Sequence, residues 1–184
     1  MIAGETVRAA ARHCGVHKNT SFRWRHRFLN KLSEAKPSHL HGIVEADETS
    51  FLESFKGSRD LPRPARKRGG KAAKRGLSDE QIPVLIARDR TTATTDAVLE
   101  SANTQEVRAV LEPVLDPVLD PDTVLCSDGS AVYVALAKPL HIAHQPVNLS
   151  AGIRVVDHAF HIQNVNAYDS QGNRMNANVV NLRK

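Results

Sequence analysis

The sequence has few cysteines and no long apolar run, and both absences limit what the chain can be. Cys14 and Cys126 are the only cysteines in 184 residues, and neither lies in a Cys-x-x-Cys or Cys/His spacing. A disulfide scaffold and a cysteine-based zinc site are therefore excluded, and we expect two buried thiols. No apolar stretch approaches the roughly 20 residues that span a bilayer, and the N-terminus lacks the apolar core of a signal peptide. We expect a soluble, cytoplasmic protein with no membrane partner.

Histidine is frequent, but the sequence does not indicate a histidine metal site. The nine histidines nowhere form the His-Glu-x-x-His spacing of a zinc protease. Positive charge is in excess, because 25 Lys and Arg residues against 20 Asp and Glu residues give a net charge of +5. Cationic side chains neutralise phosphates and release condensed counterions, so nucleic acid is the first partner to test.

The N-terminal segment, residues 1–35, has the pattern of a helix-turn-helix. Small and apolar residues recur at helical spacing in residues 5–14, and Gly15 ends that helix. Asn19 or Thr20 can cap a second helix that runs through residue 29. This second helix carries the cations that we expect to contact DNA, which are Lys18, Arg23 and Arg27. The alternative is an ordinary helical hairpin with a solvated charged face.

A polar linker at residues 36–41 leads into a second domain at residues 42–168. Within it, residues 56–75 contain nine cations and only one acid, with proline and glycine interspersed. Such a loop needs no fixed structure and can lie along a nucleic-acid backbone. We expect its central cations Arg66, Lys67 and Arg68 to bind DNA phosphates. The alternative is a solvated loop insertion.

The rest of this domain alternates strands and helices. Apolar runs predict a strand at residues 42–51, a hairpin at 82–99 and strands at 123–129 and 141–147. Helical spacing predicts helices at 104–115, where Thr104 can serve as the cap, at 130–138 and within 155–168. This order suits an α/β fold with a mixed sheet flanked by helices. The polar, Asn-rich residues 169–184 have no apolar face, so we expect a disordered tail.

Two of the predicted strands carry acids near their ends. Asp47 lies in the run at residues 42–51, and Asp128 follows the apolar run at residues 123–127. Carboxylates held in this way can bind Mg²⁺ or Mn²⁺, which prefer oxygen ligands. Two such ions about 4 Å apart activate the attacking oxygen and stabilise the leaving oxygen in phosphodiester transfer. The alternative is that both aspartates only cap turns.

Four segments together resemble the DDE-type transposases of ISXO-like insertion sequences. The resemblance covers about residues 5–168, and its combination of motifs is far more specific than any one segment. The matching segments are Val44-Glu45-Ala46-Asp47-Glu48-Thr49, Phe55-Lys56-Gly57, Ser127-Asp128-Gly129 and His161-Ile162-Gln163-Asn164-Val165-Asn166-Ala167-Tyr168. The resemblance implies a ribonuclease-H-like fold, DNA cleavage and strand transfer, and two divalent metal ions, Mg²⁺ or Mn²⁺.

The resemblance also implies roles for individual residues. Asp47 matches the first catalytic acid and Asp128 the second, both as metal ligands. Asn166 stands where related elements have the third acid, and an amide binds a cation more weakly than a carboxylate. Glu48 is adjacent to Asp47, so we expect it on the opposite face of the strand.

The chain departs from the family at both ends, so we expect a truncated transposase. The family begins with a zinc ribbon, for which no cysteine pairs precede residue 5, and continues past Tyr168 with a basic, aromatic helix that includes a functionally important lysine. We therefore expect impaired strand transfer. The alternative function is a non-catalytic DNA-binding protein or repressor derived from a transposase. We expect insertion-sequence ends and target DNA as partners. The sequence leaves open whether the chain forms a homo-oligomer.

Overall fold

The computed structural model describes residues 5–34, 36–53, 55, 58–67, 70–74, 78–115 and 120–175. The chain divides into two compact units, Met1–Pro37 and Ser38–Lys184. None of the helices within the described ranges is both long enough and apolar enough to cross a membrane.

The first unit is a pair of helices, α1 (Val7–His13) and α2 (Lys18–Glu34). The Thr6 hydroxyl caps α1 by accepting a hydrogen bond from the Ala9 amide at 3.2 Å. Helix α2 begins before the caps that we expected, and the His17 ring nitrogen Nδ1 accepts from the Asn19 amide at 3.3 Å. Cys14, which we expected to be buried, is exposed at the end of α1.

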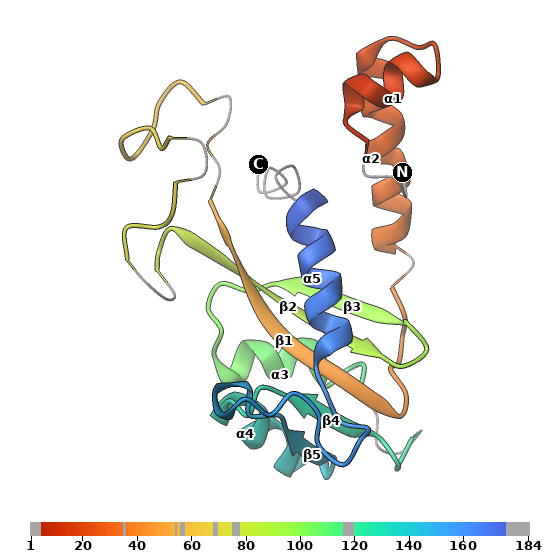
Figure 1. Ribbon diagram of the computed structural model, residues 1–184, viewed down its shortest axis with the longest axis vertical. Coiled ribbons are helices and arrows are strands. Elements are labelled where there is room, and N and C mark those ends of the chain that lie inside the picture. Colours follow the sequence, from red (N-terminus) through yellow and green to blue (C-terminus); the bar gives the residue numbers. More distant parts are fainter. Residues whose placement is uncertain are drawn as a thin grey trace. The chain divides into compact units, whose positions relative to one another are not determined.

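The second unit is built on one five-stranded sheet with the strand order β3-β2-β1-β4-β5 (Figure 1). Strands β1 (Ile43–Leu52), β2 (Gln81–Asp89) and β3 (Thr94–Val98) are antiparallel. Strands β4 (Val124–Ser127) and β5 (Ala143–Pro146) run parallel to β1. This mixed sheet with flanking helices confirms the expected α/β class.

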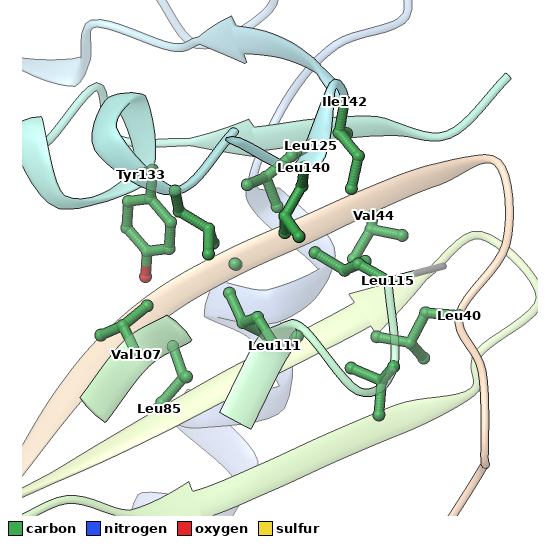
Figure 2. Packing of buried hydrophobic residues seen from close by; sticks show 14 of the residues in the cluster. Leu40, Val44, Leu85, Val107, Leu111, Leu115, Leu125, Tyr133, Leu140 and Ile142 are labelled. Carbon is green, nitrogen blue, oxygen red and sulfur yellow. The ribbon is translucent and has the colours of Figure 1, made fainter. Parts of the chain in front are cut away.

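Helices α3 (Thr104–Leu111) and α4 (Ala131–Leu140) cover one face of the sheet. Asn103, one residue before the cap that we expected, caps α3 by accepting from the Glu106 amide at 2.9 Å. Figure 2 shows the core between these helices and the sheet, where side chains from both layers interdigitate. The labelled side chains are Leu40, Val44, Leu85, Val107, Leu111, Leu115, Leu125, Tyr133, Leu140 and Ile142.

The opposite face of the sheet is covered by helix α5 (Gln163–Met175), which follows the short 3-10 helix η1 (Leu149–Ala151). Ile162 and Val165 pack there against Ile86 of β2 and Cys126 of β4. Helix α5 lies across β1 and β2 (Figure 1). The sheet is therefore the middle layer of three.

Helix α5 extends into the segment that we expected to be a disordered tail. It continues past Tyr168 to Met175, and residues 176–184 lie outside the described residues. Tyr168 packs against the second core cluster and Asp169 is buried. These two residues follow Val165 at helical spacing, so they continue its buried face by one turn even though the segment is polar.

Candidate active site

Strand β1 carries acids on both of its faces. Val44 and Ala46 point to the core under α3 and α4, so Glu45 and Asp47 point to the α5 face because side chains alternate along a strand. Glu48 returns to the first face, where it interacts with Tyr133 of α4. This arrangement agrees with the sequence expectation for Glu48.

Asp47 lies in the middle of β1, and Asp128 directly follows the end of the neighbouring parallel strand β4. Glu45 of β1 pairs with Cys126 of β4, and each of these residues stands two positions before one of the two aspartates. The pKa of Asp47 is raised to about 6, chiefly by burial; the hydrogen bond from the Glu48 amide opposes the rise, and the nearby Asp128 charge contributes to it. The structure therefore brings the two sequence-predicted acids together.

Each of these carboxylates is oriented by a backbone amide. Asp47 Oδ1 accepts from the Glu48 amide at 2.9 Å, and Asp128 Oδ1 accepts from the Ser130 amide at 2.9 Å. The turn between Asp128 and α4 requires Gly129, whose φ is +84° and whose added Cβ would lie 3.3 Å from Pro146 Cβ. Both carboxylates are thus held by local backbone geometry, as a ligand site requires.

On the other face of β1, Glu48 and Tyr133 interact close to Asp47 and Asp128. Burial raises the pKa of Glu48, the Tyr133 phenol counteracts the rise, and the charges of Asp47 and Asp128 add to it. Burial and the Glu48 charge raise the pKa of Tyr133, whose hydroxyl points toward β1 in Figure 2. Negative charge therefore concentrates on both faces of the sheet at this point.

Asn166, the sequence-predicted third site residue, is half-buried on α5. It lies on the sheet-facing side of the helix, between the buried residues Val165 and Asp169. Asp169 was not predicted from sequence, although its position three residues after Asn166 puts it one helical turn further along the same side. Burial raises the pKa of Asp169 to about 7, and the Asp47 charge contributes to the rise.

A buried ion network fixes α5 above this site, and sequence reasoning missed it. Glu45 is fully buried, and its carboxylate accepts from the Asn164 amide at 2.8 Å, the Asn164 side-chain amide at 2.9 Å and the Val165 amide at 3.1 Å. Arg90 Nη1 lies 3.2 Å from Glu45 Oε1, and His161 Nδ1 lies 3.3 Å from the same oxygen. Glu45 thus caps the first turn of α5, where an anion is favoured by the free amides and the helix dipole.

The contact between Arg90 and His161 ties the imidazole into this network. Arg90 Nη1 lies 2.6 Å from His161 Nε2, and a guanidinium group can only donate. His161 Nδ1 lies 3.3 Å from both Glu45 Oε1 and the Gln163 amide nitrogen. These contacts link β1, β2 and the start of α5.

The donor set suits a hard divalent cation, although the full ligand set is not preassembled. In the described part of the chain, no three His, Cys, Asp or Glu residues converge as a metal-binding group. Mg²⁺ is commonly held by one or two carboxylates together with water and substrate phosphates. Asp47 and Asp128 supply such a pair, and Asp169 Oδ1 is a buried oxygen with no hydrogen-bond partner among the described residues. The residues present therefore fit Mg²⁺ or Mn²⁺.

The residues predicted to bind DNA differ in how exposed their side chains are. Lys18, Arg23 and Arg27 are exposed on α2. In the basic loop Lys67 is exposed, whereas Arg66 Nη2 lies 2.7 Å from Glu80 Oε2 and its side chain is only 19% exposed. Arg68 lies outside the described residues. Arg66 thus holds the loop to the start of β2, a role that the charge pattern did not reveal.

Comparison with known proteins adds a family assignment. A family model described as an ISXO2-like transposase domain matches residues 39–180, which is more than half of the chain. The match continues past Tyr168, where we expected the resemblance to end. No curated protein matches the chain significantly.

Solved structures show only distant likeness. A chain of the simian T-cell lymphotropic virus intasome in complex with PP2A regulatory subunit B56 gamma is 11% identical with a TM-score of 0.38, over 78% of this chain and 45% of that chain. A pre-cleavage Mos1 transpososome is 11% identical with a TM-score of 0.35, and a Mos1 paired-end complex is 12% identical with a TM-score of 0.33. Each Mos1 match covers 91% of this chain and 66% of that chain. This chain thus spans less than two thirds of the length of the intasome chain, and TM-scores this low support no statement about activity or partners.

Proposed function

Since this chain belongs to the ISXO2-like transposase family, whose domain matches residues 39–180, we propose that it cuts DNA and transfers strands by metal-dependent phosphodiester chemistry. The observation that supports the proposal is the interaction between Asp47 in β1 and Asp128 just past the end of the neighbouring parallel strand β4, where the charge of Asp128 contributes to the raised pKa of Asp47. Two carboxylates on adjacent parallel strands are a suitable pair of ligands for a shared metal site.

Within this proposal Asp47 and Asp128 are metal ligands, and Asn166 on α5 is the third site residue. Divalent ions, when bound, would activate the attacking oxygen and neutralise charge on the scissile phosphate. Glu45 is a positioning residue in this scheme, because its hydrogen bonds set the start of the helix that carries Asn166. The amide of Asn166 offers an uncharged oxygen to this site.

We assign DNA contacts to the exposed cations outside the acidic site. Lys67 on the basic loop and Lys18, Arg23 and Arg27 on α2 are exposed, and Arg68 continues the charge of the loop. Phosphate contacts of this kind supply affinity and register without sequence information.

We also propose that strand transfer by this chain is impaired. The residues after Tyr168 continue α5, but they lack the basic and aromatic character that the family resemblance implies for this helix. DNA that contacts α5 would meet few cations there, so positioning of the reacting strand would be poor.

A non-catalytic DNA-binding role is the second candidate. It is favoured by the exposed cations of α2, which need no metal to bind DNA. In this case a fragment of the DNA flanking the gene would be bound and protected but not cut. Arg23→Ala and Arg27→Ala would then weaken binding, by about 1–3 kcal/mol each if these residues read bases, whereas Arg12→Ala on α1 serves as a matched control.

The deciding experiment measures nicking of the DNA that flanks the gene, with Mg²⁺, with Mn²⁺ and with a chelator. The proposal expects slow, metal-dependent nicking that is lost in Asp47→Asn and in Asp128→Asn. Asp122→Asn is the matched control, because Asp122 is an exposed aspartate close to β4. Metal-independent binding without nicking, unchanged in both variants, would favour the non-catalytic role.

A further inference from the structure

Asp169, at the start of the divergent segment, lies near the acidic site. It is 8% exposed on α5, and its Oδ1 is buried with no hydrogen-bond partner among the described residues. The charge of Asp47 acts on it directly. Asp169 is therefore a buried acid on the sheet-facing side of α5, unpartnered at Oδ1 within the described part of the chain and near enough to Asp47 for their charges to interact.

The other two buried acids of the described residues, Glu45 and Asp89, are hydrogen-bonded. Glu45 accepts three hydrogen bonds and contacts Arg90. Asp89 accepts from the Thr91 amide and hydroxyl and from the Ala93 amide. A buried carboxylate oxygen without a donor is unfavourable unless a cation or donor compensates it. Asp169 is the exception, which indicates an unfulfilled ligand role.

The neighbouring cations are already engaged by other groups. The Arg88 guanidinium lies over the Tyr168 ring, 5.4 Å from its centroid. Arg90 contacts Glu45, His161 and the Ala159 carbonyl. An added cation is therefore the simplest partner for Asp169.

We propose that Asp169 supplies a third carboxylate to the divalent-metal site formed by Asp47 and Asp128, a role that rests on the proposed function. A third carboxylate raises the negative charge of the site and adds a hard oxygen ligand for Mg²⁺ or Mn²⁺. Asn166, one helical turn earlier, then contributes a neutral oxygen beside it. Because three acids do not yet converge in the described residues, binding requires rotation of these side chains toward the ion.

The test is Mn²⁺ binding to the full chain at pH 8, monitored by the decrease in the electron paramagnetic resonance signal of free Mn²⁺. We expect Asp169→Asn to weaken binding at least tenfold, as Asp47→Asn does, whereas Asp169→Glu retains more affinity than Asp169→Asn. Asn166→Ala should change affinity less than Asp169→Asn, and the exposed control Asp122→Asn should bind as the wild type does.

Two outcomes separate this proposal from the proposed function. If Asp169→Asn binds Mn²⁺ like the wild type while Asp47→Asn does not, the role of Asp169 is overturned and the metal site of Asp47 and Asp128 stands. If neither variant changes the affinity, both proposals fail. The Mg²⁺-induced rise in melting temperature is a second readout, measured also with Asp169→Ser, and a rise equal to that of the wild type overturns the role of Asp169.

Discussion

The fully buried Glu45 carboxylate accepts a hydrogen bond from the Asn164 amide at 2.8 Å, across 119 positions of sequence. This contact joins the strand that carries Asp47 to the first turn of the helix that carries Asn166 and Asp169. Together with the apolar packing of Ile162 and Val165, this carboxylate therefore fixes the start of α5 on the sheet.

Replacing Glu45 should destabilise the second unit strongly. Glu45→Gln keeps the shape of the side chain but removes the negative charge that faces Arg90. It also turns an N–H group of the new amide toward the N–H donors of Asn164 and Val165. Breaking a buried ion pair in this way costs about 3–5 kcal/mol of unfolding free energy, measured by urea denaturation. Glu112→Gln, which removes an exposed pair with Arg108 on α3, is the matched control and should change stability little. A loss under about 1 kcal/mol in Glu45→Gln would contradict the assigned role.

Asp47 should make stability depend on pH in metal-free buffer. Its pKa is raised from 3.8 to about 6 in the folded chain, chiefly by burial. Folding therefore favours the protonated form of Asp47. The stability that this form contributes to the folded chain is fully present below about pH 4 and is lost as the pH rises through about 6. Asp47→Asn should match the wild type at pH 4 and exceed it at pH 8 in the free energy of unfolding. Equal stability of the two proteins at pH 8 would show that the Asp47 carboxylate is well solvated.

Sequence patterns located the strands of the acidic site but not the contacts that hold its helix. Apolar runs next to Asp47 and Asp128 were sufficient to predict β1 and β4, because local hydrophobicity carries that signal. The expected position near a strand end holds for Asp128, which directly follows β4, but not for Asp47, which lies in the middle of the longer β1. Glu45 has the pattern of an ordinary polar strand position, and its partners Arg90 and Asn164 are remote in sequence. The extension of α5 was missed because its buried face there consists of Tyr168 and Asp169, which local hydrophobicity does not detect.

The basic loop should act on DNA mainly through Lys67 and Arg68. Neutralising Arg66, Lys67 and Arg68 together should weaken binding to any sequence and reduce the salt slope, by about 0.9 for each phosphate that the protein no longer neutralises. Because Arg66 pairs with Glu80, Arg66→Gln alone should change the slope less than Lys67→Gln. Titrations at several salt concentrations measure this, with Lys138→Gln on α4 as the control. An unaltered slope in the triple variant would make the loop a solvated insertion.

The segment after Asp169 should limit strand transfer. A chimera that keeps Asp169 and replaces residues 170–184 with the basic segment of a family relative should transfer DNA ends at least tenfold faster than the native chain. The gain should disappear when Asp47→Asn is added. Equal rates for the native chain and the chimera, assayed side by side, would show that the native segment is sufficient.

The most direct test of the metal site is a crystal structure of the full chain grown with Mn²⁺, with anomalous diffraction recorded to locate the ion. The account predicts an anomalous peak in contact with carboxylate oxygens of both Asp47 and Asp128. The absence of a peak there, with the two carboxylates more than roughly 10 Å apart and so too far for one or two bridging metals, would contradict it.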